Sequence, residues 1–192
     1  MKFELSEHSP SITVKRTLKI LTDTLTELLA EEPFEKITVM QICNHSMIPR
    51  ATFYNYFDDK YDFLDYYWAE HFMQVLPHIP QQSYNTIDYL TQVLENLSLY
   101  LQKHFDTSKS IYKINQHGQF FLSMLNYVTN RTMKVLEYDT ELQKSTSTPL
   151  SLTANFLASS TLTIGFWWIE HQEEATLEDI CSYFRLLVKN TL

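Results

Sequence analysis

Apolar side chains recur at steps of three and four along most of the chain, and this spacing predicts helices rather than strands. The first stripe follows Ser9 and Pro10, a capping residue and a proline suited to a first helical turn, and ends before Pro33. It consists of Val14, Leu18, Leu21, Leu25, Leu28 and Leu29. Similar stripes occupy residues 59–76, 86–105, 120–137, 150–170 and 176–189, whereas the polar stretch 140–149 is predicted to be a loop. No alternating strand pattern is sustained, so we expect an all-α fold of about nine helices.

Between the first two stripes, two short helices are predicted with a break of a few residues between them. Thr38 followed three residues later by Gln41 forms a capping box, which starts a helix of about two turns. The break covers residues 44–48, and Pro49 can open a second helix that ends near Tyr56. Two short helices joined by a tight turn and flanked by longer helices are typical of a helix-turn-helix.

Composition limits the remaining classes of function. Only two of the 192 residues are glycine, so the phosphate loops and the nucleophile elbow, which need closely spaced glycines, are excluded. The two cysteines, Cys43 and Cys181, stand far apart and are expected to be buried apolar residues, and no His/Cys spacing fits a metal. We therefore expect no cofactor, no metal and no enzymatic activity. The polar N-terminus and the interrupted apolar stretch 156–169 predict a cytoplasmic protein that does not enter the membrane.

The second short helix carries side chains that could read DNA, because the N-terminal residues of such a helix lie nearest the base edges in the major groove. The candidates for base contacts are Arg50, Ala51, Thr52 and Asn55, and the candidates for phosphate contacts are Thr38, Tyr54, Tyr56 and Lys60. The net charge of −8 disfavours nonspecific binding to nucleic acid. Residues 36–60 nevertheless contain three basic and two acidic side chains, a local charge of +1. Phe53 and Phe57 are expected to belong to the core.

The segment TVMQICNHSMIPRATFYNYFDDKYDFL, residues 38–64, resembles the DNA-binding signature of the TetR/AcrR family of bacterial transcriptional regulators. The positions that match are Thr38, Ile42, Thr52, Phe53, Tyr54, Tyr56, Phe57 and Lys60. The form of residues 50–62 resembles a subgroup that includes regulators of dihydroxyacetone kinase. Two residues depart from the family pattern: Met47 replaces the usual turn glycine, and Pro49 replaces the usual Ser or Thr before the second helix. A methionine at a turn position that favours positive φ predicts local strain.

The resemblance implies a DNA-binding domain at residues 9–75, with its helix-turn-helix at about 38–57, and a helical ligand-binding and dimerisation domain at residues 76–192. It implies a ligand-responsive homodimeric repressor that binds a palindromic double-stranded operator. The alternative is a transcriptional coactivator whose C-terminal domain binds a protein instead of a small molecule. Candidates for the effector pocket are Tyr89, Tyr100, Asn115, His117, Phe120, Phe121, Tyr127 and Trp168. Candidates for the dimer interface, on the last two helices, are Ala158, Leu162, Gly165, Ile180, Phe184 and Leu187.

Overall fold

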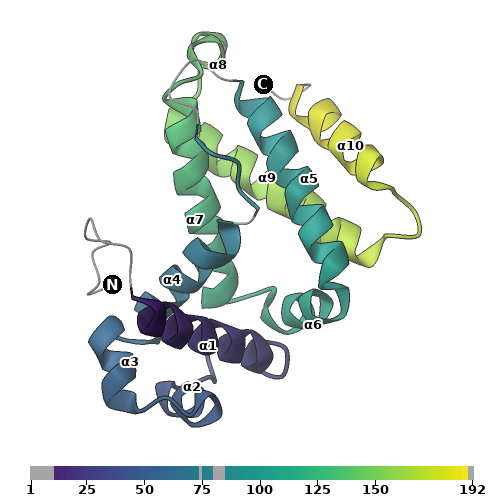
Figure 1. Ribbon diagram of the computed structural model, residues 1–192. Coiled ribbons are helices and arrows are strands. Elements are labelled where there is room, and N and C mark those ends of the chain that lie inside the picture. Colours follow the sequence, from purple (N-terminus) through teal and green to yellow (C-terminus); the bar gives the residue numbers. More distant parts are fainter. Residues whose placement is uncertain (1–10, 74, 80–84, 190–192) are drawn as a thin grey trace. The chain divides into compact units, whose positions relative to one another are not determined.

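The computed structural model describes residues 11–73, 75–79 and 85–189, and within them the chain forms ten α-helices and no strand (Figure 1). The expected all-α architecture is confirmed, with one helix more than the nine anticipated. The helices gather into two compact units. The N-terminal unit extends to Glu70 and also includes Asp106–Ser123. The C-terminal unit comprises His71–Phe105 and the chain from Met124 onward.

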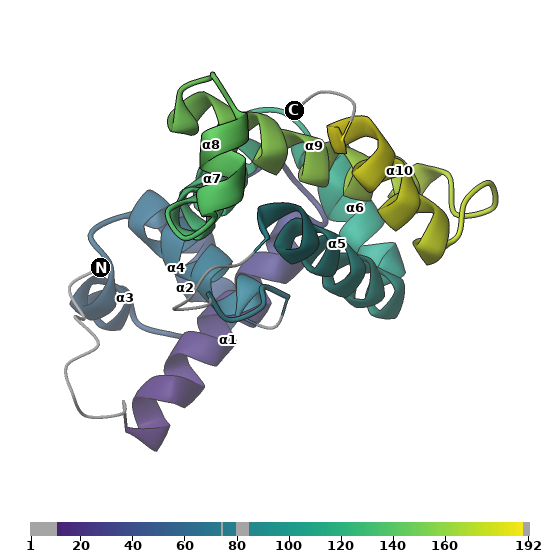
Figure 2. The ribbon, with the colours of Figure 1, turned by 90° about the horizontal axis from the view of Figure 1, so that it is seen from above.

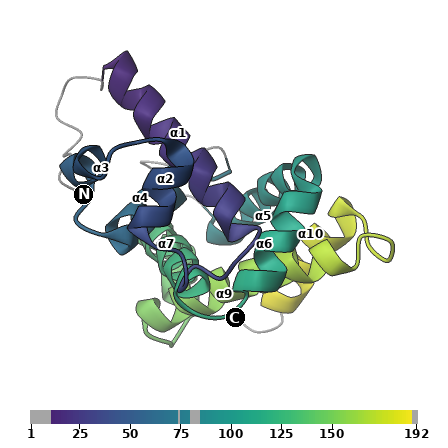
Figure 3. The same ribbon diagram turned by 90° about the horizontal axis from the view of Figure 1, so that it is seen from below.

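The N-terminal unit is built around α1 (Ile12–Leu29), α2 (Val39–Ser46), α3 (Arg50–Tyr56) and most of α4 (Lys60–Phe72). Ser11 caps α1 by accepting a hydrogen bond from the Val14 N–H. Figure 3 shows α2 beside α1 and joined to α3 by a short turn. Helix α1 packs on α2, and its apolar stripe is buried. The side chains with no exposed surface in this core include Leu21, Leu25, Leu29, Phe34, Ile42, Phe53, Phe57 and Phe63.

Nearly all of α6 (Phe105–Asn115) and the first residues of α7 (Gln119–Leu136) also belong to the N-terminal unit. The buried Asn115 side chain connects them to the rest of this unit. Its Oδ1 accepts from the Phe34 N–H at 2.8 Å, and its Nδ2 donates to the carbonyls of Leu29 and Ile111 at 2.9 and 3.1 Å. These bonds satisfy buried polar groups 81 and 86 residues away in the sequence. The N-terminal unit therefore includes a segment beyond residue 75, the boundary expected from the sequence.

The C-terminal unit contains α5 (Thr86–Lys103), the rest of α7, α8 (Thr140–Ser145), α9 (Leu150–Glu170) and α10 (Leu177–Lys189). Helices α5, α9 and α10 pack together, as Figure 2 shows. Gly165 permits the close approach of α9 to α5, because a Cβ at this position would stand only 3.2 Å from Leu97 Cδ2. The Trp168 indole N–H donates to the Ala175 carbonyl at 2.9 Å and ties α9 to the loop before α10.

Helix α8 occupies a stretch that the sequence predicts to be a loop, so this part of the prediction is wrong. The six residues of α8 have no apolar stripe, and the helix depends on its cap. The nearly buried Asp139 carboxylate accepts from the Leu142 N–H at 3.0 Å, within α8, and from the Thr86 N–H at 2.7 Å, in the first turn of α5. One carboxylate therefore stabilises the starts of two helices.

Candidate nucleic-acid interface

The capping box expected at the start of α2 is present. The Thr38 hydroxyl accepts from the Gln41 N–H at 3.2 Å, and the Gln41 Oε1 accepts from the Thr38 N–H at 2.9 Å and from its hydroxyl at 2.8 Å. Gln41 also donates to the Glu32 carboxylate at 2.7 Å. Gln41 thus accepts from both donors of Thr38, and this capping box orders the start of α2.

The turn between α2 and α3 has the strained conformation expected from the sequence. Met47 caps the C-terminus of α2 with φ 54° and ψ 25°, in the left-handed region. Its side chain is 89% exposed, so no packing offsets the strain. Pro49 precedes α3 at the N-cap position and supplies no side-chain hydrogen bond.

Replacing Met47 by glycine is expected to stabilise the protein by about 1 kcal/mol, because glycine adopts positive φ without the Cβ clash. In thermal unfolding this corresponds to a rise of roughly 2–4 °C in Tm. Met40→Gly is the matched control, since Met40 is also exposed but lies within α2, where glycine is expected to cost about 1 kcal/mol. An unchanged or lower Tm for Met47→Gly would contradict the strain at this turn.

Helix α3 is anchored by one side chain and directs most of the others outward. Phe53 is fully buried, with ring centroids 5.4 Å from Phe57 and 5.5 Å from Phe63. The core positions expected for Phe53 and Phe57 are therefore confirmed. Of the candidate DNA contacts on this helix, four are exposed and two are half-buried. The exposed ones are Arg50, Ala51, Tyr54 and Asn55, and the half-buried ones are Thr52 and Tyr56.

Arg50 is paired with the tyrosine one helical turn later. Its guanidinium carbon lies 5.8 Å from the centroid of the Tyr54 ring. A hydrogen bond with the Tyr54 side chain raises the pKa of Arg50 further above its already high ordinary value. This contact lies on the solvent side of α3 and limits the rotamers of a long side chain before any ligand is bound.

Lys60 has three acceptors within its own unit. Its ammonium donates to the carbonyls of Phe34, Glu35 and Ile37 at 3.0, 3.0 and 2.8 Å, and lies 4.7 Å from the centroid of the Phe34 ring. Burial lowers the pKa of Lys60, while the Glu35 carboxylate opposes that shift. All three N–H groups of the ammonium thus serve the turn that leads into α2, an arrangement that the sequence pattern alone does not reveal.

Three exposed cations of the N-terminal unit were not selected from the sequence. Lys36 lies two residues before the cap of α2, and Lys15 and Arg16 lie in the first turns of α1. None of the three forms an ion pair with another described residue. They are separated in the sequence and produce no charge run, so the sequence pattern does not single them out, although they belong to the same unit as α3.

Two family profiles match the chain. The profile described as "Bacterial regulatory proteins, tetR family" matches residues 21–67, which include the capping box, the strained turn and α3. The TetR-type profile described as "Transcriptional regulator C-terminal region" matches residues 88–190, more than half of the chain. The chain belongs to the TetR family. It is therefore a helix-turn-helix DNA-binding transcriptional regulator and not an enzyme.

Solved structures agree with the TetR fold. A putative TetR-family transcriptional regulator from Syntrophomonas wolfei is 16% identical, with a TM-score of 0.65 over 93% of this chain and 95% of that one. A TetR transcriptional regulator from Streptococcus agalactiae 2603V is 21% identical, with a TM-score of 0.60 over 92% and 95%. A search of curated protein sequences returned no match.

The candidate pocket residues of this TetR-family protein divide between its two units. Asn115, His117, Phe120 and Phe121 lie in the N-terminal unit, and Tyr89, Tyr100, Tyr127 and Trp168 lie in the C-terminal unit. The polar atoms of several of them have partners in the fold: those of Asn115 and Trp168 are described above, and the Tyr89 hydroxyl donates to the Pro77 carbonyl at 3.3 Å. His117 is exposed, and Phe120 packs on Trp68 with a centroid distance of 4.6 Å.

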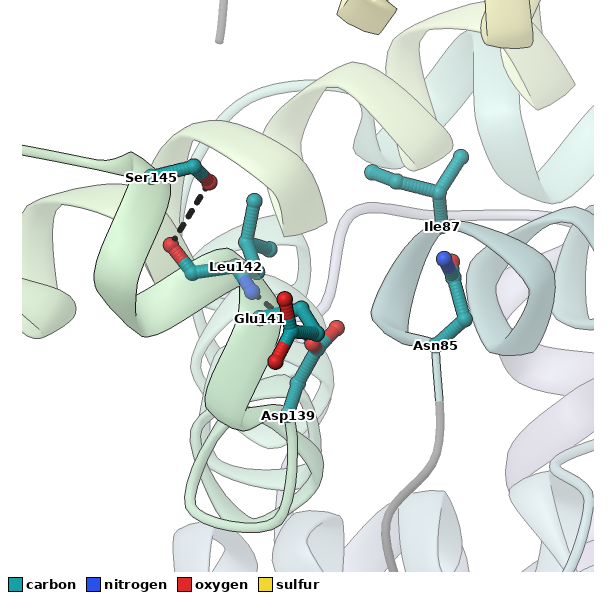
Figure 4. A pocket seen from close by; sticks show the side chains of 6 residues that line it. All are labelled: Asn85, Ile87, Asp139, Glu141, Leu142 and Ser145. Atoms are coloured by element: carbon teal, nitrogen blue, oxygen red, sulfur yellow. Dashed lines mark hydrogen bonds between the residues drawn. The ribbon is translucent and has the colours of Figure 1, made fainter.

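A hollow of about 310 Å³ opens on the surface of the C-terminal unit, between the start of α5 and α8 (Figure 4). None of the eight candidate pocket residues lines it. The lining residues are Asn85, Ile87, Asp139, Glu141, Leu142 and Ser145. Among the described residues no cluster of His, Cys, Asp and Glu is suited to a metal, and no helix is long and apolar enough to span a membrane.

The six candidate dimer residues lie on α9 and α10, but five of them are buried inside the single chain. These five are Ala158, Leu162, Gly165, Ile180 and Phe184, which pack within the C-terminal unit. Only Leu187 is exposed. The sequence pattern selected these inward-facing residues because α9 is apolar on more than one face. The spacing of its apolar residues therefore does not distinguish the inward face from the outward one.

Proposed function

We propose that this TetR-family regulator is a homodimeric repressor that reads a palindromic operator through α3 and releases it when a small molecule binds the C-terminal unit. The observation that carries the proposal is the outward face of α3. A buried Phe53 fixes the helix while Arg50, Tyr54 and Asn55 remain exposed. Arginine suits bidentate contacts to guanine, and asparagine suits adenine. Tyr56 and Thr52, half-buried beside them, are proposed as supporting contacts.

An exposed apolar surface on the last two helices supports the dimer. On α9, Leu152, Phe156 and Trp167 are spaced so that they share one face, and on α10 Tyr183, Leu186 and Leu187 are exposed. The rings of Trp167 and Tyr183 are 6.5 Å apart, which makes the two helices one continuous surface. We propose that a second copy of the chain covers this dimer face, since a two-fold dimer presents two recognition helices to half-sites about 34 Å apart.

Leu152→Glu and Leu186→Glu are each expected to weaken the dimer at least about a hundredfold, because burying an unpaired carboxylate is costly and two-fold symmetry introduces it twice. Sedimentation velocity of the purified protein measures the change directly. Leu122→Glu is the matched control, because Leu122 is 48% exposed and lies in the N-terminal unit, away from α9 and α10 in the sequence. A dimer that survives both substitutions on the dimer face would contradict the assignment.

The regulatory part of the proposal is tested by operator release. A panel of small molecules is screened for those that raise the Tm of the protein and lower its affinity for DNA, since a ligand that favours one state shifts both. Typical coupling of about 1–3 kcal/mol predicts a loss of roughly 5- to 150-fold in operator affinity. A protein whose DNA affinity responds only to a protein partner would support a coactivator instead.

A further inference from the structure

Arg131 is a half-buried cation without a counter-charge among the described residues. It lies on α7 in the part of that helix that belongs to the C-terminal unit. Its only hydrogen bond to a described residue runs from Nη2 to the Pro77 carbonyl at 3.1 Å. Its Nε is buried and has no acceptor, and no carboxylate in the described part of the chain forms an ion pair with it. The chain has 23 acidic residues, so it is notable that none in the described part forms an ion pair with Arg131.

The single hydrogen bond of Arg131 does not explain its presence. The Pro77 carbonyl also accepts from the Tyr89 hydroxyl, so it remains satisfied without the guanidinium. The neutral Pro77 carbonyl supplies no counter-charge, and the buried Nε–H of the guanidinium has no acceptor. A buried donor without an acceptor, on a side chain that its one described partner does not need, is a feature that a functional site would explain.

The surroundings of Arg131 match an oxyanion attached to an apolar group. Tyr127 lies one helical turn earlier. Burial raises the pKa of its hydroxyl, and the positive charge of the nearby Arg131 opposes that rise. The Tyr127 ring stacks on Phe72, with centroids 5.2 Å apart and planes inclined by 8°. A guanidinium with a buried Nε–H and an aromatic ring beside it provides a forked donor and an apolar wall.

We propose that Arg131 anchors a small anionic effector, a molecule whose carboxylate or phosphate binds the guanidinium and whose apolar part lies against Tyr127. The proposal names the chemical class of the effector and rests on the ligand response proposed above. Arg131 supplies the positive charge, and the ligand supplies the missing counter-charge. The Nε–H donates to one oxygen of the anion.

The first test needs no ligand. Arg131→Met keeps most of the apolar stem and removes the buried Nε–H that has no acceptor, so the Tm of the full chain is expected to rise by roughly 2–4 °C. Arg185→Met is the matched control, because Arg185 is exposed and paired with Asp88 at 2.7 Å, and its loss is expected to change the Tm little. A clear fall in Tm for Arg131→Met alone would show that Arg131 is a structural residue and would overturn the proposal.

The second test uses benzoate, octanoate and phenyl phosphate at millimolar concentration, with benzamide, octanol and phenol as uncharged counterparts. At least one anion is expected to raise the Tm while its counterpart does not, and Arg131→Met is expected to weaken its binding at least about tenfold in calorimetry. Failure of all three anions, or equal binding to Arg131→Met, would overturn the site. An anion that binds through Arg131 without releasing DNA would support the Arg131 site and contradict the proposed ligand response. Release of DNA by an uncharged molecule alone would support the ligand response and contradict the Arg131 site.

Discussion

Replacing Arg50 by alanine is expected to weaken binding to the selected operator by about 1–3 kcal/mol, or roughly 5- to 150-fold. The side chain is exposed at the start of α3, and its contact with Tyr54 orders it before DNA arrives. The loss should be much smaller on unrelated DNA, since base contacts supply discrimination while phosphate contacts supply general affinity. Fluorescence anisotropy with both duplexes at several salt concentrations separates the two effects.

Two further variants serve as controls for Arg50. Tyr54→Phe removes the hydroxyl that bonds to Arg50 but keeps the ring, so its effect is expected to be in the same direction and smaller. Arg16→Ala removes an exposed cation of the same unit and is expected to lower affinity equally for all sequences, if at all. Equal losses on specific and unrelated DNA for Arg50→Ala would contradict the proposed base contact.

Replacing Lys60 by methionine is expected to lower the stability of the protein by about 2–4 kcal/mol, because three carbonyls lose a charged donor together. Methionine retains the apolar stem beside Phe34, so the loss reports on the ammonium rather than on packing. The expected fall in Tm is roughly 4–16 °C. Urea unfolding followed by circular dichroism measures the change in free energy.

Lys36→Met is the matched control for Lys60→Met. Lys36 is exposed, lies in the turn before α2 whose carbonyls accept from Lys60, and makes no ion pair within the described part of the chain. We expect it to leave stability unchanged and to reduce the salt dependence of DNA binding by the equivalent of about one phosphate contact. If Lys60→Met instead melts normally and weakens DNA binding as Lys36→Met does, Lys60 contacts phosphate and its structural role is refuted.

Features determined by neighbouring residues could be predicted from the sequence. The capping box of Thr38, the positive φ of Met47 and the buried position of Phe53 all depend on residues a few positions apart. The function of Lys60 could not be predicted in this way. Its position fits a family pattern, but its three acceptors lie 23 to 26 residues away and become visible only in the fold.

Features determined by distant contacts could not be predicted, because their partners lie far apart in the sequence and meet only in the fold. Asn115 connects α6 to residues more than 80 positions earlier, and Asp139 connects α8 to α5 across 53 positions. The inward and outward faces of α9 both carry apolar residues, so Leu162 and Phe156 are equally good interface candidates by spacing. Burial separates them, since Leu162 is 1% and Phe156 38% exposed.

The most direct test of the central claim is selection of binding sites from random duplex DNA with the full chain. We expect enrichment of one palindromic sequence with half-sites about one helical turn apart, bound by a dimer and lost on Arg50→Ala. An enriched site without two-fold symmetry, or a palindrome that Arg50→Ala still selects, would contradict dimeric reading by α3.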